Sequence, residues 1–294
     1  MDWQLRLMRL DDLNAIANVE CTALHISKNR ARNPAFIKTA LLNNPNGCFV
    51  GIAGGCVVGY VITIISGNVG WIGSIEVAFS QGGNGLKLAL LNEAINFLNK
   101  HAEITSIQLP NESIRFIQKS IELGFQLVEP QIILQNETEK LIKIPDKKII
   151  SVMEINDIFN VTDFMNLTVE NNIAEIVELN TENFPAGKLL LETVSRRTND
   201  MPDYRLISFG FVARNLTAEP LKAILNLAAK KASTYKAKKI FVALNGFYRN
   251  ELQTLIQSGW KIIKTTNRLI HHKSVPTYKK YLAEPVVDLS QWTL

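Results

Sequence analysis

The sequence predicts an α/β protein made of two copies of one mixed-sheet domain in tandem, and three observations support this prediction. The chain has 294 residues, 47% of them hydrophobic, which is enough for two cores of ordinary size. Short segments rich in Val and Ile alternate with amphipathic segments of helical period. The same order of segments then occurs a second time. We therefore expect one domain over residues 1–137 and a second over residues 149–294.

The first copy is expected to open with a short strand at Trp3–Arg9 and a helix that starts at Leu10. Asp11 and Asp12 lie in the first turn of this helix, where acidic side chains complement the helix dipole. After a polar stretch at residues 28–32, a second short helix is expected near Phe36–Leu42.

No charged residue occurs between Gly47 and Ile75, a length that would allow one membrane-spanning helix. Gly54-Gly55 and Ser66-Gly67-Asn68 instead divide the segment into short pieces rich in Val and Ile. We expect three buried strands, with a membrane helix as the alternative. The predicted strands are Cys48–Ala53, Cys56–Ile65 and Gly70–Val77.

A glycine-rich loop at residues 81–85 follows, and then a helix over Leu86–Lys100 whose leucines fall on one face. The remaining elements are a strand, a helix and a long closing strand. They are predicted at Ser106–Leu109, Ser113–Leu123 and Phe125–Leu134. The charged stretch 136–148 contains a proline and predicts a linker between the domains.

The repeat is defined by a constant interval between matching residues. Val77 matches Val212 (212 − 77 = 135), and the same interval of 135 joins the other pairs. These pairs are Leu86-Lys87 with Leu221-Lys222, Leu109 with Leu244, and Gly124-Phe125 with Gly259-Trp260. Upstream the interval is ten residues larger (153 − 8 = 145, Met8 with Met153), so the second copy is expected to be shorter there. The aromatic tail 274–294 fits neither copy, and we expect it to pack across one of them.

The composition excludes several classes of function. The net charge is +5 but only 20% of the residues are charged, without a long basic run, so we expect no nucleic-acid partner. Cys21, Cys48 and Cys56 have no paired spacing, and His271-His272 lack a partner ligand, so no disulfide and no metal site are expected. No secretory signal is visible, and a cytoplasmic protein without membrane attachment is the expectation.

The loop at residues 81–85 stands between a buried strand and an amphipathic helix, which is the setting of an anion site. Glycines let successive amides turn toward an oxyanion, and the helix directs its N-terminal amides to the same point. A flexible surface turn is the alternative.

The stretch Val77–Leu91 resembles the acetyl-CoA motif of the GNAT superfamily, V-x-P-x-x-[RQ]-G-x-G-x-[GA]-x-x-L-L. Val77, Gly83, Gly85, Leu90 and Leu91 are in register with it. The order of the predicted elements is also similar to that of the family over nearly all of the first half. The resemblance implies tandem GNAT-like domains with acetyl-CoA as co-substrate.

The residues that the resemblance assigns to coenzyme binding are Ile75, Val77, Gly82, Gly83, Asn84, Gly85, Leu86, Lys87 and Asn111. The sequence departs from the motif at Phe79 in place of proline, at Gly82 in place of Arg or Gln, and at Lys87 in place of a small residue. Asn111 lies two residues before the expected position. Lys87 could place a positive charge beside the pyrophosphate or could crowd it.

Two residues are candidates for catalysis. An amine of pKa about 10.4 is roughly 4.6 kcal/mol from its neutral form at pH 7, so transfer needs a base. Glu76 is the carboxylate at the end of the uncharged strands and is the candidate base, with Ser74 as a residue that could hold a water. The alternative for Glu76 is a solvent-facing rim position. Ser120 stands where the family often has the tyrosine that protonates the departing thiolate.

The second copy lacks these features, since its loop 212–221 has no glycine and places Glu219 and Pro220 at the helix start. We expect a degenerate domain without a coenzyme site. The expected activity is N-acetylation of a primary amine on a small molecule or peptide, with a homodimer left open. His25, Arg30 and Arg32 lie in the expected acceptor region, although structural or solvated roles are the simpler interpretation. The alternatives are a non-catalytic acyl-CoA-binding or regulatory protein and a purely structural partner-binding protein.

Overall fold

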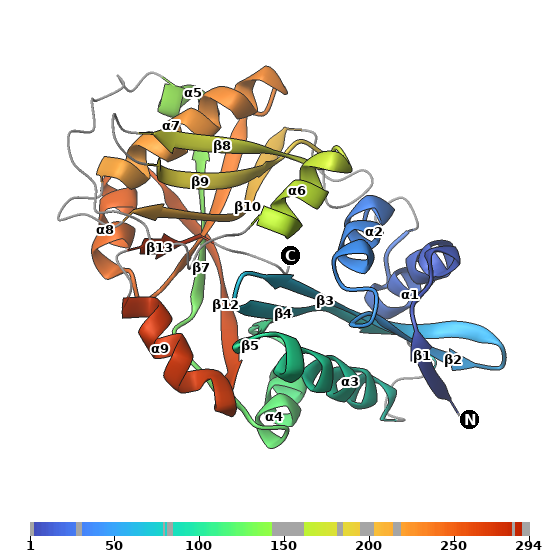
Figure 1. Cartoon of the computed structure of the whole chain (residues 1–294). Coiled ribbons are helices and arrows are strands. Elements are labelled where there is room, and N and C mark those ends of the chain that lie inside the picture. The colour runs from blue at the N-terminus through green and yellow to red at the C-terminus, as the bar shows by residue number, and fades with distance from the viewer. Residues whose placement is uncertain are drawn as a thin grey trace.

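The computed structural model describes residues 3–27, 31–78, 80, 85–142, 162–180, 185–194, 203–213, 219–283 and 286–289. Within these ranges the strands of both copies form a single mixed sheet of 13 strands. The order along the sheet is β1-β2-β3-β4-β5-β12-β7-β11-β10-β9-β8, with β6 paired to β12 and β13 paired to β10. Figure 1 shows the two halves of the sheet joined through β12 and β7.

The elements of the first copy follow the predicted order. Its strands are β1 (Gln4–Leu7), β2 (Phe49–Ala53), β3 (Cys56–Ser66), β4 (Val69–Val77), β5 (Ile104–Pro110), β6 (Phe125–Leu127) and β7 (Gln131–Glu137). Its helical elements are the 3-10 turn η1 (Leu10–Asp12), α1 (Leu13–Leu24), α2 (Pro34–Asn43), α3 (Leu86–His101), α4 (Ile114–Glu122) and α5 (Thr138–Ile142). The uncharged block forms β2, β3 and β4, so the alternative of a membrane helix is wrong. None of the described helices is long and apolar enough to cross a membrane.

Helices cover both faces of the first half of the sheet (Figure 1). Side chains of α1 and α2 pack with Tyr60 and Ile62 of β3 in one cluster. The next residue along β3, Val61, belongs to a second cluster with the leucines of α3. Because successive strand residues point to opposite faces, α1 and α2 lie on one face and α3 on the other.

The second copy repeats this plan. Its strands are β8 (Ala174–Asn180), β9 (Pro185–Glu192), β10 (Tyr204–Ala213), β11 (Lys239–Asn245) and β12 (Lys261–His271). Its helices are α6 (Thr162–Glu170), α7 (Glu219–Thr234) and α8 (Arg249–Gln257). The predicted early match at residues 153–158 lies outside the described residues.

The interval of 135 residues holds in three dimensions. The bounds of β11 are those of β5 shifted by this interval (239 − 104 = 135), and the bounds of α8 are those of α4 (249 − 114 = 135). Gly124 and Gly259 follow these helices with φ of 95° and 88°. Left-handed backbone of this kind strongly favours glycine, which explains why both copies carry it at this point.

The closing strands of the two copies are exchanged. Strand β7, from the first copy, pairs with β11 of the second copy over its whole length. The carboxyl half of β12, from the second copy, pairs with β5 of the first over residues 266–270. The two exchanged strands also pair with each other and thereby join both halves into one sheet.

The prediction of one closing strand at Phe125–Leu134 is therefore wrong. The strand ends at Leu127, and Pro130 separates β6 from β7. Proline lacks the amide that a continuing ladder requires, and its carbonyl accepts a hydrogen bond from Gly246 N of the second copy at 2.8 Å. The predicted linker 136–148 is also wrong in its first part, where residues 136–137 end β7 and α5 follows.

The carboxy-terminal segment packs on the sheet, but against both copies and not against one as predicted. It contains the 3-10 turn η5 (His272–Ser274), helix α9 (Val275–Ala283) and strand β13 (Val286–Asp288). Tyr278 of α9 is buried, and its hydroxyl accepts a hydrogen bond from Asn245 Nδ2 at 2.7 Å. Ser274 Oγ accepts a hydrogen bond from Thr105 N of β5 at 3.0 Å, so the segment contacts both copies.

Candidate active site

The parallel strands β4 and β5 separate part of the way along their length. They are paired from Val69 with Ile104 to Ile72 with Ile107. Beyond this point β4 continues to Val77 and stays paired with β3 on its other side. The register with β3 shifts at Gly73-Ser74, which marks a bulge. The described strands thus leave the edge of β4 after Ile72 open toward β5.

Helix α3 begins next to this opening. Gly85 is its N-cap with φ of 84°, and no atom of the described residues lies within 4 Å of the place where a Cβ would stand. A helix start of this kind directs positive partial charge at the opening, which suits an anionic group. Leu86 is fully buried beneath it. The predicted coenzyme residues Gly82, Gly83 and Asn84 lie outside the described residues.

The structure places Glu76 on the face of the sheet covered by α1 and α2. Glu76 is directly opposite Tyr60 in the β3–β4 ladder, and opposed residues of an antiparallel pair share one face. The Glu76 side chain is 24% exposed, and its Oε2 lies 3.4 Å from Lys87 Nζ. Lys87 Nζ also lies 4.8 Å from the centre of the Phe116 ring. A carboxylate with partial solvent access therefore stands at the end of β4, beside the first turn of α3.

A buried polar cluster surrounds Glu20 of α1, next to Tyr60, the residue opposite Glu76. Tyr60 donates a hydrogen bond to Glu20 Oε1, and Arg32 donates to the same carboxylate from Nε at 3.2 Å and from its backbone N at 2.6 Å. Burial lowers the pKa of Arg32, but its neighbours Tyr60 and the carboxylate of Glu20 outweigh burial, so this pKa is raised. Burial also raises the pKa of Tyr60 well above its usual range, so the phenol is the hydrogen-bond donor.

The sequence did not single out Glu20 or Tyr60. The available signal was a carboxylate on a mostly apolar helix, followed twelve residues later by an arginine. The interpretation of Arg32 as a solvated loop residue is wrong, because only 13% of its side chain is exposed. Arg30 lies outside the described residues.

Of two further predicted residues, Ser120 lies within α4 and Asn111 precedes this helix. Ser120 is fully buried, and its hydroxyl donates to Phe116 O at 2.8 Å, so the geometry argues against its role as an acid for a departing thiolate. Asn111 follows β5 and is held by β12. Its Nδ2 donates to Thr265 Oγ1 at 3.0 Å, and its Oδ1 accepts from Asn267 Nδ2 at 2.9 Å.

The histidines show no ligand geometry. His25 is exposed and ends α1 in the left-handed conformation, with φ of 52°. His271 is buried against the edge of Phe125, and burial together with the charges of His272 and Lys273 lowers its pKa to about 4. No group of three or more metal-ligating side chains occurs in the part of the chain that the structure describes.

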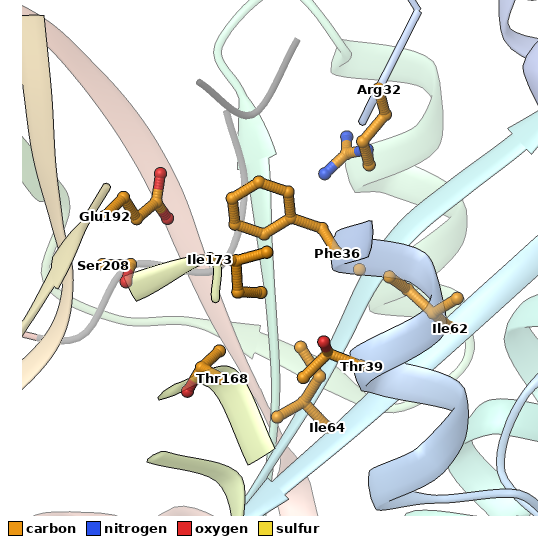
Figure 2. A pocket seen from close by; sticks show the side chains of 10 residues that line it. Arg32, Phe36, Thr39, Ile62, Ile64, Thr168, Ile173, Glu192 and Ser208 are labelled. Carbon is orange, nitrogen blue, oxygen red and sulfur yellow. The ribbon is translucent and has the colours of Figure 1, made fainter. Parts of the chain in front are cut away.

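A pocket lies between the two copies on the face that carries Glu76. It comprises about 420 Å³ of space, part of it open to solvent, and is lined by both copies. Figure 2 shows Arg32 and Phe36 on one side of it and Glu192 and Ser208 on the other. Gly73 and Ser208 are equivalent residues (208 − 73 = 135), and each stands at the bulge of its central strand. The pocket thus spans the two central strands of the repeat.

The second copy has the same opening, but its own chain fills it. Pairing of β10 with β11 ends at Ile207 with Val242, as in the first copy. Strand β13 then pairs antiparallel with β10 at Phe211, Val212 and Ala213. Leu289 N extends this contact by donating to Gly210 O at 2.9 Å, and the Leu289 side chain is fully buried.

The fold and the site define a class of protein. A splayed parallel strand pair, a glycine-capped helix start and an adjacent carboxylate make an α/β domain suited to a phosphate-bearing ligand beside a proton acceptor. The second copy has the same architecture without an accessible site.

Comparison with known proteins gives the family. Residues 12–121 match the model of the acetyltransferase (GNAT) family. The first copy is a GNAT domain, and the chain has the fold of a tandem GNAT protein. The family match of the first copy supports acyl transfer from an acyl-coenzyme A. A search of curated proteins gave no match.

Solved structures share the fold along both copies. A putative acetyltransferase from Pyrococcus horikoshii is 14% identical, with a TM-score of 0.61 over 91% of this chain and 88% of that chain. A tandem GNAT protein from the clavulanic acid biosynthesis pathway is 11% identical, with a TM-score of 0.61 over 92% and 98%. A GCN5-related N-acetyltransferase from Sphaerobacter thermophilus is 10% identical, with a TM-score of 0.55 over 91% and 95%.

Proposed function

We propose that the chain is an acetyl-CoA-dependent N-acetyltransferase that acetylates a primary amine at the first copy. The observation that carries the proposal is the position of Glu76, at the open end of β4 and on the same face as the pocket between the copies. A base at this point can take a proton from an amine in the pocket while the coenzyme lies along the open edge of β4.

The roles of the chain's own groups follow from this arrangement. Glu76 accepts a proton from the ammonium, directly or through a water, and the neutral amine then attacks the thioester carbonyl. Lys87 and the start of α3 provide positive charge for the coenzyme phosphates. Backbone amides at the open edge of β4 polarise the carbonyl that is attacked.

The burial of Ser120 bears on the last step. A thiol of pKa about 8.5 leaves as thiolate at a penalty of roughly 2 kcal/mol at pH 7, so transfer can proceed without a strong acid. The same observation favours a second candidate function, a non-catalytic acyl-CoA-binding protein. The two candidates differ in whether thiol is released.

The test is incubation with acetyl-CoA and a panel of primary amines, with free thiol followed over time. We expect release that depends on the amine, and a loss of about 100-fold in turnover for Glu76→Gln with coenzyme affinity little changed. Glu122→Gln is the matched control, because it breaks an exposed ion pair with Lys119 away from the pocket. Coenzyme binding without release for any amine would favour the second candidate, and release without an amine would indicate hydrolysis.

A further inference from the structure

The pocket between the copies has an apolar middle and two polar sides. Phe36, Ile62 and Ile64 of the first copy and Ile173 of the second provide apolar surface. The space of about 420 Å³ between these side chains includes volume that is open to solvent, so the pocket suits only a compact molecule that extends toward its mouth. Figure 2 shows Arg32 and Glu192 reaching toward this apolar middle from opposite sides.

Arg32 is prepared to bind an anion. Its Nε and backbone N are held by Glu20, which fixes the side chain, and its terminal nitrogens point toward Phe36 and the pocket in Figure 2. Among the hydrogen bonds of the described residues, none uses Arg32 Nη1 or Nη2. A guanidinium with both terminal nitrogens available matches the two oxygens of a carboxylate.

Glu192 supplies the opposite charge on the other side. It ends β9, is only 3% exposed, and lines the pocket with Ser208 of β10. A carboxylate has about four lone-pair sites, so Glu192 can accept from an ammonium group in addition to the contacts it already makes. Buried charges of opposite sign, separated by apolar surface, select a ligand with the complementary order of groups.

We propose that the pocket binds a basic amino acid, with its carboxylate on Arg32 and its side-chain ammonium on Glu192, and that its α-amine is the acceptor. The methylene groups of such a ligand lie against Phe36 and Ile173. The α-amine is adjacent to the carboxylate, which places it at the Arg32 side of the pocket. Glu76 is on that side, since it lies opposite Tyr60, and Tyr60 and Arg32 donate hydrogen bonds to the same Glu20 carboxylate.

This inference rests on the proposed function for its chemistry. The α-amine nitrogen forms a bond to the acetyl carbon while the carbon–sulfur bond of the thioester breaks. Of the two protons that the ammonium loses, one leaves through Glu76 and one returns to the thiolate. Acetylation removes the charge of the α-ammonium and leaves the side-chain ammonium unchanged, so we expect the product to keep its contact with Glu192 and to lose its attraction to Glu76.

The test compares three ligands of similar length by calorimetry with coenzyme A present, and by thiol release with acetyl-CoA. L-Lysine carries both charged groups, L-norleucine lacks the side-chain ammonium, and 1,5-diaminopentane lacks the carboxylate. We expect lysine to exceed each analogue by about 10- to 100-fold, the usual range for one hydrogen-bonded charge. Glu192→Gln is expected to abolish the preference over norleucine only, and Arg32→Gln the preference over the diamine only.

The controls separate charge from stability. Glu178→Gln removes a negative charge and Arg249→Gln a positive charge from the surface of the second copy. They match Glu192→Gln and Arg32→Gln in charge and are expected to change neither preference. If Arg32→Gln does not fold because Glu20 loses its partner, Arg32→Lys keeps the charge but not the fork and is expected to reduce the same preference. Wild-type protein that binds lysine no better than the analogues, or variants that keep both preferences, would overturn the inference. Lysine binding without thiol release would instead keep the pocket assignment and refute the proposed function.

Discussion

Replacing Leu269 with alanine tests the strand exchange at a single side chain. Leu269 belongs to the second copy by sequence, but it lies opposite Ile107 of β5 in the first copy. It is fully buried there, in the cluster that contains the leucines of α3. Truncation of such a leucine costs about 3 kcal/mol through lost burial and the cavity left behind. That free energy corresponds to a factor of roughly 100 in a local opening equilibrium.

The assay is amide hydrogen exchange below the unfolding transition, together with urea unfolding. We expect Leu269→Ala to speed exchange in β5 and α3 of the first copy. Leu134 is its equivalent (269 − 134 = 135) and lies opposite Val242 of β11. Leu134→Ala is therefore expected to speed exchange in the second copy. Leu255→Ala, in α8, is the control for a buried leucine outside the exchanged strands. The reverse pattern for the two exchanged leucines would refute the pairing of β12 with β5.

Three further predictions concern the site, the acid stability and the tail. Gly85→Glu is expected to abolish coenzyme A binding in calorimetry. Gly259→Glu is the control, because Gly259 has a similar φ and equally open space, and this variant is expected to lose only about 1 kcal/mol of stability. Equal coenzyme A binding by both variants would show that the site is not at the start of α3. The pKa of His271 is lowered to about 4 from 6.5, so the unfolded chain binds a proton at this histidine at higher pH than the folded chain does. The folded state therefore has its full stability above pH 6.5 and loses stability as the pH falls below that value. Between pH 7.5 and pH 5, the free energy of unfolding measured in urea is expected to fall by about 2 kcal/mol less in His271→Leu than in the wild type. The same fall in both proteins would contradict the burial argument. Deletion of residues 284–294 removes β13 and is expected to lower the melting temperature while coenzyme A stoichiometry stays at one per chain, and a stoichiometry of two would show that the tail alone blocks a second site.

The sequence predicted the elements and the repeat because these depend on local patterns. The glycines at 124 and 259 mark helix ends that need left-handed backbone, and the spacing between the copies is constant over strands and helices alike. The opening beside Gly85 was predictable for the same reason, since a strand, a glycine-rich loop and a helix are adjacent in the chain.

The strand exchange was not predictable from these patterns. Leu134 and Leu269 occupy equivalent positions in equivalent strands, and both are fully buried leucines. The hydrophobic pattern is satisfied whether a strand closes its own copy or the other, so it contains no information on the partner. Pro130 interrupts the ladder and was the one local sign of a change in direction.

Two features could not be predicted from the sequence, the face of the sheet on which Glu76 lies and the pocket between the copies, and the reasons differ. The bulge at Gly73-Ser74 breaks the alternation of β4, so counting residues from the buried core does not give the side on which Glu76 lies. The pocket joins Arg32 and Glu192, residues that are far apart in the chain and that come together only through the packing of the two copies.

The exchange also explains how the second copy contributes to the proposed site although its own opening is filled. Its opening is filled by β13, and Glu219 and Pro220 stand at the start of α7. Yet its strand β12 completes the first half of the sheet and positions Asn111 through Thr265 and Asn267. Its residues also form one wall of the pocket. A first copy alone would lack a strand beside β5 and one wall of the pocket, so both copies are needed to form the proposed site.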